Sequence, residues 1–221
     1  MASFSLRRDA VLLAFAALSA TACLAALAAG RQDWVLLVKP LPVLALAALV
    51  QPRPDGYSRL VFAGLLLSAL GDVLLELGPD RFLFGVGAFF LAHLAYIAAF
   101  VRADRRPRLL AALPALALGL LVFPRLLPGL EQQGLLVPVL VYTIALCTMM
   151  WRALARLGGG AGKDILAGTL GATAFALSDS LLALDRFAPE GAPLPGVRFA
   201  ILGLYWLGQL GIALSASRSF R

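Results

Sequence analysis

Residues 58–77 read SRLVFAGLLLSALGDVLLEL, a run of twenty residues that is apolar apart from a few polar positions. A helix of that length rises about 30 Å, which matches the hydrocarbon core of a bilayer. The whole chain has the same character, since 61% of its 221 residues are hydrophobic and only 14% are charged. A soluble domain carries about 25% Asp, Glu, Lys and Arg. The sequence therefore predicts a protein that is covered by lipid.

Reading outward from this run, we find eight apolar segments long enough to cross a membrane as helices. They are expected at about Asp9–Ala29, Trp34–Val50, Ser58–Leu77, Arg81–Val101, Arg108–Leu126, Gly134–Leu154, Asp164–Leu184 and Gly196–Ala216. Turn-forming residues separate them, including the basic stretch Arg102–Arg108 and the segments Pro128–Gly134 and Pro189–Gly196. The predicted fold class is all-α, a polytopic membrane bundle of eight transmembrane helices. Because no connection is long enough for a soluble domain, residues 1–221 are expected to form a single integral-membrane domain.

The basic residues fall mainly on one side of this predicted bundle. With eight spans, 13 of the 19 Lys and Arg residues, Arg218 and Arg221 among them, lie on the side of the N-terminus. Loops rich in Lys and Arg stay in the cytoplasm, so both termini are predicted to be cytoplasmic. We expect an integral protein of the bacterial inner membrane, surrounded by membrane lipids. These topology signals explain the net charge of +7, so no nucleic-acid partner is expected, and the sequence indicates no oligomeric state.

Four ionisable residues lie inside the apolar spans, where a charge near the bilayer centre costs on the order of 3 kcal/mol. They are Lys39, Asp72, His93 and Asp179. The alternating direction of the spans brings all four into one slab of the membrane, from the midplane outward on the side away from the termini. We interpret them as one polar pocket that opens to the non-cytoplasmic side.

Further polar side chains lie at similar depths on the same helices. Ser68, Asp72 and Glu76 repeat every four residues, so they share one helix face. The other polar candidates are Tyr96, Tyr142, Ser178, Tyr205 and Gln209.

Each of these residues also has a simpler interpretation. Lys39 lies near a helix end and is compatible with snorkelling to the interface. The aspartates are compatible with structural hydrogen bonds between helices, and the tyrosines and the histidine with packing. Glu76 and Asp185 lie close enough to span ends that we expect them to be solvated. With a single histidine, a zinc site built from several histidines is excluded, and we expect no metal and no cofactor.

Six local strings occur in order along nearly the whole chain. They are Lys39-Pro40-Leu-Pro42, the segment Ser68–Asp72, Ala92-His93-Leu-Ala-Tyr96, Tyr142, Ser178-Asp179-Ser180 and Tyr205-Trp206-Leu-Gly208-Gln209. Together they resemble the YhhN-like lysoplasmalogenase family. The resemblance implies a membrane enzyme that binds a lysophospholipid substrate, a lysoplasmalogen, and hydrolyses its vinyl ether bond to a fatty aldehyde and a glycerophospho-amine.

The reaction implied by this resemblance suits carboxyl groups. A vinyl ether is hydrolysed by protonation at carbon, which gives an oxocarbenium ion that water captures. A protonated carboxyl group and an ionised carboxylate divide this work, as they do in glycosidases. We predict Asp72 and Asp179 as this catalytic pair, without assigning the acid, and His93 as a group that orients water or shuttles a proton. The predicted substrate-binding residues are Lys39, which would meet the lipid phosphate, and Ser68, Tyr96, Tyr142, Ser178, Tyr205 and Gln209.

Two other functions are compatible with the same residues. Intramembrane Asp, His and Lys also serve the proton relays of transporters. The chain has no internal repeat of the kind that many transporters have, and polar residues at one depth favour a one-sided pocket over a path. A metal-dependent lipid hydrolase of the ceramidase type relies on several histidines, and this chain has one. A hydrolase is therefore the prediction, with a small-solute or lipid transporter as the alternative.

Overall fold

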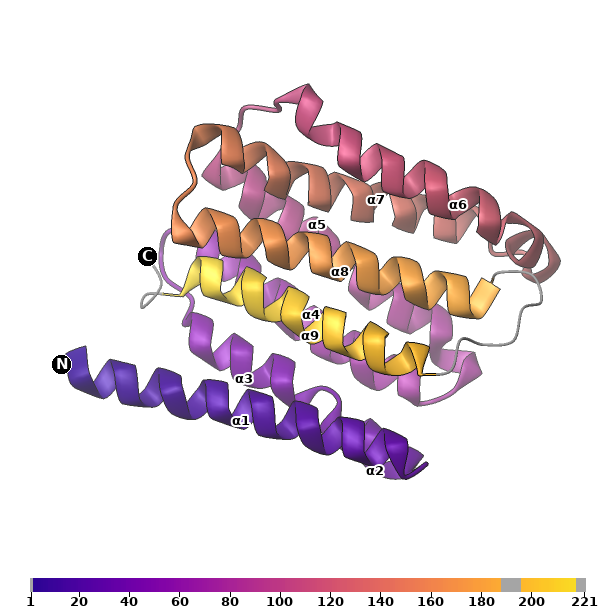
Figure 1. The fold of residues 1–221 in the computed structure, drawn as a ribbon, viewed down its shortest axis with the longest axis horizontal. Coiled ribbons are helices and arrows are strands. Elements are labelled where there is room, and N and C mark those ends of the chain that lie inside the picture. The colour runs from indigo at the N-terminus through magenta and orange to yellow at the C-terminus, as the bar shows by residue number, and fades with distance from the viewer. Residues whose placement is uncertain (1, 188–195, 218–221) are drawn as a thin grey trace.

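A computed structural model describes residues 2–187 and 196–217, which form helices joined by short turns (Figure 1). The longer helices are α1 (Ala2–Ala28), α2 (Gln32–Val38), α3 (Leu41–Val50), α4 (Tyr57–Glu76), α5 (Phe82–Ala103), α6 (Leu113–Gln133), α7 (Leu136–Ala155), α8 (Lys163–Phe187) and α9 (Val197–Ala216). Short 3-10 helices precede or follow some of them, namely η1 (Pro79–Arg81), η2 (Leu109–Ala112) and η3 (Arg156–Gly159).

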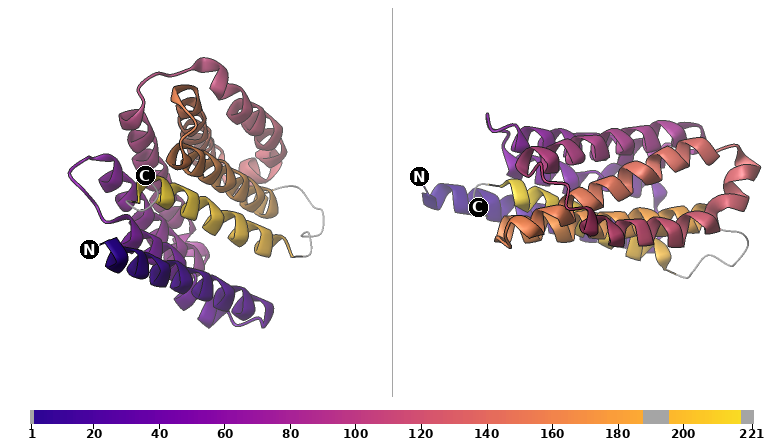
Figure 2. Two further views of the ribbon diagram at one scale, coloured as in Figure 1. Left: turned by 60° about the vertical axis from the view of Figure 1, so that its left-hand side comes forward. Right: turned by 90° about the horizontal axis from the view of Figure 1, so that it is seen from above.

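The membrane spans lie side by side and alternate in direction along the chain, with α2 and α3 together forming one span, so the N- and C-terminal ends lie at the same end of the bundle (Figures 1 and 2). Within the described residues, eight helical segments are long and apolar enough to cross a membrane. The predicted all-α bundle of eight membrane helices is therefore confirmed. The side of the membrane that holds the termini stays a prediction. Arg218, Arg221 and the predicted turn Pro189–Gly196, apart from its last residue, lie outside the described residues.

The second predicted span, Trp34–Val50, is interrupted near its start. α2 ends at Val38 and α3 begins at Leu41, so Lys39 and Pro40 lie at the junction. Proline has no backbone N–H and its ring crowds the preceding turn, so a helix ordinarily stops before it. The Lys39 side chain is buried at this break, inside the bundle.

The fifth predicted span continues further than expected. α6 passes through Pro124 and Pro128 and ends at Gln133, so the turn predicted at Pro128–Gly134 is wrong except for its last residue. Gly134 follows the helix with a φ of 66°, a left-handed conformation that glycine adopts without strain. The sequence interpretation gave the prolines too much weight, because membrane helices tolerate proline better than soluble helices do.

Glycine contacts bring two helix pairs close together. Between α8 and α9, a Cβ atom at Gly171 would lie 2.6 Å from the backbone nitrogen of Ile212. Between α4 and α5, a Cβ atom at Gly71 would lie 2.6 Å from the ring of Phe89. Small residues of this kind let membrane helices approach closely. The two pairs therefore hold the polar residues of neighbouring helices at fixed heights relative to each other.

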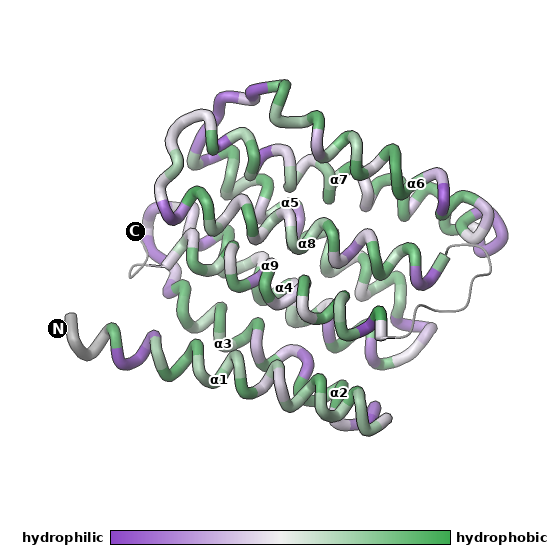
Figure 3. The backbone as a smooth tube through the Cα atoms, viewed as in Figure 1, coloured by the Kyte–Doolittle hydropathy of each residue, from purple (hydrophilic) through white to green (hydrophobic). Residues whose placement is uncertain are grey.

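The hydropathy of the chain separates the helix bodies from the loops. Hydrophobic residues cover most of each helix, and hydrophilic residues gather toward the two ends of the bundle (Figure 3). The outer helix α6 exposes large apolar side chains, among them Leu120, which is 75% exposed. An apolar surface of this extent is stable when lipid covers it.

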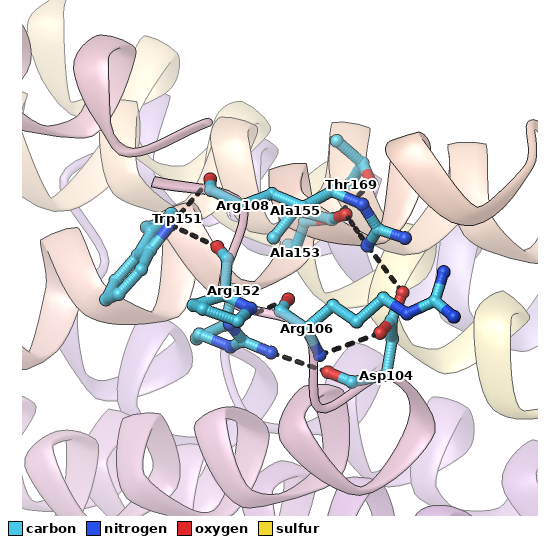
Figure 4. Close-up of polar contacts among 9 residues, drawn as sticks. Asp104, Arg106, Arg108, Trp151, Arg152, Ala153, Ala155 and Thr169 are labelled. Atoms are coloured by element: carbon cyan, nitrogen blue, oxygen red, sulfur yellow. Dashed lines mark hydrogen bonds and ion pairs between the residues drawn. The ribbon is translucent and has the colours of Figure 1, made fainter. Parts of the chain in front are cut away.

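The basic loop at residues 104–108 is fastened to the end of α7 (Figure 4). Arg152 donates hydrogen bonds to two backbone carbonyls of this loop, one of them that of Asp104 at 2.5 Å. The indole of Trp151 donates to a third carbonyl at 2.9 Å. Arg108 donates to the Asp104 carboxylate, and this hydrogen bond holds the pKa of that carboxyl below its usual value. Basic residues at this end of the bundle therefore have structural roles in addition to any role in topology.

Candidate active site

A cavity of about 520 Å³ lies between the ends of α4, α5, α7, α8 and α9 that are opposite to the termini. Cavities of this size commonly hold small-molecule ligands. The lining residues are Lys39, Asp72, Leu75, Glu76, Phe82, Val86, Phe89, Val139, Tyr142, Ser178, Asp179, Leu182, Ala183, Asp185, Arg186, Phe187, Arg198, Ile201, Leu202 and Tyr205. The cavity therefore combines an apolar wall with both intramembrane aspartates.

Asp72 occupies one side of the cavity, on α4. Its side chain is 1% exposed, and its Oδ2 atom accepts a hydrogen bond of 2.6 Å from the hydroxyl of Tyr205 on α9. Its Oδ1 atom lies 3.9 Å from the Lys39 ammonium group. Lys39 also donates a hydrogen bond of 2.8 Å to Glu76, one turn further along α4. Asp72 thus has a hydroxyl donor and a positive charge beside it.

Asp179 occupies the other side of the cavity, on α8. It accepts a hydrogen bond from the hydroxyl of Tyr142 on α7, and its Oδ2 atom lies 3.6 Å from Nε2 of His93 on α5. The histidine is fully buried, and its Nδ1 atom lies 2.7 Å from the carbonyl oxygen of Phe89. A carbonyl oxygen only accepts hydrogen bonds, so Nδ1 carries a hydrogen and donates. In the neutral ring, Nε2 is then a hydrogen-bond acceptor that faces Asp179.

An aromatic cluster connects these two sides of the cavity. The ring of Phe175 is fully buried, with its centroid 4.9 Å from that of His93 and 5.4 Å from that of Tyr205. Phe89 packs edge to face against Phe175 at 6.1 Å and against Tyr205 at 5.8 Å. Such packing fixes the directions in which the histidine and tyrosine side chains point. The polar groups are therefore held by a rigid apolar frame.

Most of the predicted site residues meet at this cavity. Asp72 and Asp179 line it, and so do four of the predicted binding residues, namely Lys39, Tyr142, Ser178 and Tyr205. His93 lies behind Asp179 and is not among the lining residues. The hydroxyl of Ser178 donates to the backbone carbonyl of Ile201 on α9, so it joins two helices.

Three predicted binding residues lie outside the cavity lining, deeper in the bundle. They are Ser68, Tyr96 and Gln209, and all three are fully buried. The Tyr96 hydroxyl donates a hydrogen bond of 2.7 Å to the side-chain oxygen of Gln209. These side chains follow the expected helix faces, but they lie about one turn further from the cavity end than Asp72 and Tyr205 do.

The sequence interpretation missed several lining residues. The expectation that Glu76 is solvated is wrong, because its side chain is 15% exposed and bonded to Lys39. Asp185 is exposed as expected, yet it lines the cavity together with Arg186 and Arg198. The spacing in the sequence could have indicated the two arginines, since each lies two helical turns from a predicted site residue of the same helix. Within the described part of the chain, no three His, Cys, Asp or Glu side chains converge to hold a metal ion.

The chain is similar in sequence to several known proteins. A sequence model of the YhhN family matches residues 34–216. A protein of Sus scrofa named lysoplasmalogenase TMEM86B is 40% identical over 197 residues, which cover 86% of this chain and 78% of the relative. The Homo sapiens protein of the same name is 41% identical over 190 residues, covering 83% and 75%. A Mycobacterium bovis protein named lysoplasmalogenase is 39% identical over 153 residues, covering 64% and 56%. No solved structure shows significant similarity to the chain.

Proposed function

This chain belongs to the YhhN family, and from that premise we propose that it hydrolyses the vinyl ether bond of lysoplasmalogens. The products are a fatty aldehyde and a glycerophospho-amine. The observation that carries the proposal is the pair of intramembrane aspartates, Asp72 on α4 and Asp179 on α8, which line one cavity. The names of the mammalian and mycobacterial relatives support the same reaction.

The acid in this reaction is Asp179, and the ionised carboxylate is Asp72. A positive charge favours the ionised form of a neighbouring carboxyl group, and Lys39 lies 3.9 Å from Asp72. Asp179 instead faces His93, whose complete burial favours the neutral ring. A protonated Asp179 therefore has a neutral acceptor beside it, and its proton is available for transfer to the substrate.

The reaction proceeds in three steps. Asp179 gives its proton to the vinyl carbon remote from oxygen, so the double bond becomes an oxocarbenium ion and Asp179 becomes a carboxylate. Asp72 stabilises this cation and takes a proton from the water that attacks it, which gives a hemiacetal. The hemiacetal hydroxyl then returns a proton to Asp179 as the carbon–oxygen bond to glycerol breaks. The leaving alkoxide receives the proton held by Asp72, and both carboxyl groups regain their starting states.

The tyrosines and the histidine assist the aspartates. The Tyr205 hydroxyl donates to Asp72, and the Tyr142 hydroxyl donates to Asp179. These bonds orient each carboxyl group and stabilise the negative charge that each bears at some stage. Nε2 of His93 lies 3.6 Å from Asp179, behind it, and the uncharged ring leaves this carboxyl group in its protonated form.

The apolar part of the cavity wall accommodates the hydrocarbon chain of the lipid. It is formed by Leu75, Phe82, Val86, Phe89, Leu182 and Leu202, among others. An apolar wall also limits the water near the reacting bond to the molecule that the carboxylate holds. With the basic end of the bundle in the cytoplasm, as the Lys and Arg distribution predicts, the cavity opens to the non-cytoplasmic side of a bacterial inner membrane.

A substrate panel tests this function. Purified protein is incubated with a lysoplasmalogen, with the alkyl-ether lipid of the same chain and headgroup, and with the corresponding ester lipid, and free aldehyde is measured. We expect aldehyde from the vinyl ether alone, because only a vinyl ether gives an oxocarbenium ion by protonation at carbon. Protein that is folded but releases no aldehyde would overturn the proposal and favour transport.

A further inference from the structure

Two arginine side chains line the cavity near its open end. Arg186 lies close to the end of α8, and Arg198 lies close to the start of α9. Both residues are exposed, and among the described residues the one ion pair that either guanidinium makes is the 3.8 Å contact of Arg198 with Glu76. A guanidinium group carries five N–H donors in a planar fork that matches the oxygens of a phosphate or carboxylate. The mouth of the cavity therefore presents a surplus of donors for an anion.

Both arginines lie on the same helix faces as polar residues of the cavity. Arg186 follows Asp179 by two helical turns on α8, and Arg198 precedes Tyr205 by two turns on α9. Residues separated by two turns share a helix face and lie roughly 10 Å apart along the axis. The backbone of each arginine thus lies about two turns further toward the end of its helix than the polar residue below it. A glycerol backbone with its phosphodiester spans this distance when the vinyl ether lies between the aspartates.

Neighbouring side chains hold both guanidinium groups in place. The Arg186 guanidinium lies over the ring of Phe82, with its central carbon 3.7 Å from the ring centroid. A cation over an aromatic face is attracted by the ring and keeps its N–H edges free. Arg198 lies 3.8 Å from the Glu76 carboxylate, which Lys39 already binds at 2.8 Å. Glu76 is therefore shared, and Arg198 keeps donors for another anion.

Lys39, which the sequence analysis predicted to contact the lipid phosphate, already interacts with carboxylates of the protein. Its ammonium group bonds to Glu76 and lies near Asp72, and its side chain is 10% exposed. A phosphate at Lys39 would also meet both of these carboxylates, which repel it. At the mouth, Asp185 is exposed to solvent that screens its charge. Glu76, which lies 3.8 Å from Arg198, is neutralised by its hydrogen bond to Lys39.

We propose that Arg186 and Arg198 form a subsite for the phosphodiester group of the lysophospholipid, which fixes the vinyl ether between the two aspartates. The assignment rests on the proposed function for the identity of the lipid, and it makes these two arginines specificity-determining residues. They act by binding the anionic part of the lipid, whereas the aspartates act on the ether bond. Loss of either arginine therefore weakens the binding of phosphate-bearing lipids and leaves the binding of phosphate-free lipids unchanged.

The experiment measures the binding of two lipids that the enzyme does not cleave. One is a 1-O-alkyl lysophospholipid with an ethanolamine headgroup, and the other is the 1-O-alkylglycerol of the same chain length, which lacks the phosphate. Dissociation constants are measured in detergent for the parent protein, for Arg186→Gln and for Arg198→Gln. Arg31→Gln is the matched control, because Arg31 lies at the same end of the bundle, outside the cavity, and pairs with Asp33.

We expect each cavity variant to bind the lysophospholipid about tenfold more weakly, with the alkylglycerol unchanged and with Arg31→Gln equal to the parent. Higher ionic strength should remove part of the parent's preference for the phosphate-bearing lipid. Parent-like binding of the lysophospholipid in both cavity variants would overturn the assignment, and so would an equal loss for the two lipids. Because binding is read without turnover, arginine-dependent binding by a protein that releases no aldehyde would refute the hydrolase function and uphold the subsite.

Discussion

Replacing Lys39 with methionine tests whether this lysine is a buried counter-ion or a side chain that snorkels to the interface. Its ammonium group lies 2.8 Å from Glu76 and 3.9 Å from Asp72, and the side chains of the lysine, the glutamate and Asp72 are 10%, 15% and 1% exposed. Removing one partner of a buried ion pair costs about 3–5 kcal/mol, because the other charge stays buried without compensation. A snorkelling lysine would cost about 0.5 kcal/mol or less. In a chain of this length, the larger loss lowers the midpoint of thermal unfolding by about 6–20 °C.

The assay is thermal unfolding in detergent, followed by circular dichroism under identical conditions for every variant. Lys163→Met is the matched control, because Lys163 is an exposed lysine at the opposite end of the bundle, and it should shift the midpoint by about 2 °C or less. The double variant Lys39→Met/Glu76→Gln removes one charge of each sign and should regain part of the loss. A shift for Lys39→Met no larger than that of the control would refute the reasoning.

Three further predictions address the site, the loop and the helix packing. Tyr205→Phe removes a hydrogen bond to a buried carboxylate, about 1.5–3 kcal/mol, so kcat/KM for a lysoplasmalogen should fall roughly 10- to 150-fold; a change below about twofold would argue against the tyrosine. Arg108 lowers the pKa of Asp104, so the ionised carboxylate stabilises the folded protein. Asp104→Asn should therefore cost its full amount of stability above the unfolded pKa of about 3.9. This cost should vanish as the pH falls through the lowered pKa of the folded state. Thermal midpoints measured across this pH range check it, and a loss that persists in acid would count against it. Gly171→Ala places a Cβ atom 2.6 Å from a backbone nitrogen and should lower the midpoint by several degrees, whereas Gly203→Ala, with no atom within 4 Å, should not; equal midpoints for the two variants would contradict the packing argument.

The number of membrane spans and the depth of the polar residues within the membrane were predictable from the sequence. Lipid demands a fixed length of apolar helix, so the eight spans follow from counting residues. Alternating direction then fixes depth, which is why Asp72 and Asp179 were expected at one level and line one cavity. Both inferences use only lengths and the order of segments along the chain.

The pairing of the polar groups was not predictable in the same way. Helices such as α3 are apolar on every side, so no stripe in the sequence marks the face that each buries. The rotation of each helix decides that Tyr205 meets Asp72 and Tyr142 meets Asp179. For the same reason Gln209 was expected beside the substrate, although it bonds to a tyrosine deeper in the bundle.

The surroundings of Glu76, Arg186 and Arg198 were not predicted correctly, because the position of a residue in the sequence does not by itself give its exposure to solvent. Glu76 lies at the end of its span, where water would ordinarily reach it, but the break before α3 carries Lys39 into contact with it. Arg186 and Arg198 lie at span ends as well, where basic residues in general were interpreted as topology signals. Only the arrangement of α8 and α9 places both at one cavity.

Aldehyde release by Asp179→Asn tests most directly whether Asp179 is the acid, because asparagine keeps the size of the side chain and removes the proton that the reaction needs. The same lysoplasmalogen, detergent and protein concentration are used for the parent and the variant, and thermal unfolding shows that both are folded. We expect a loss of turnover of about 10²–10⁴-fold, the usual contribution of a general acid. Near-normal aldehyde release by folded Asp179→Asn would contradict it.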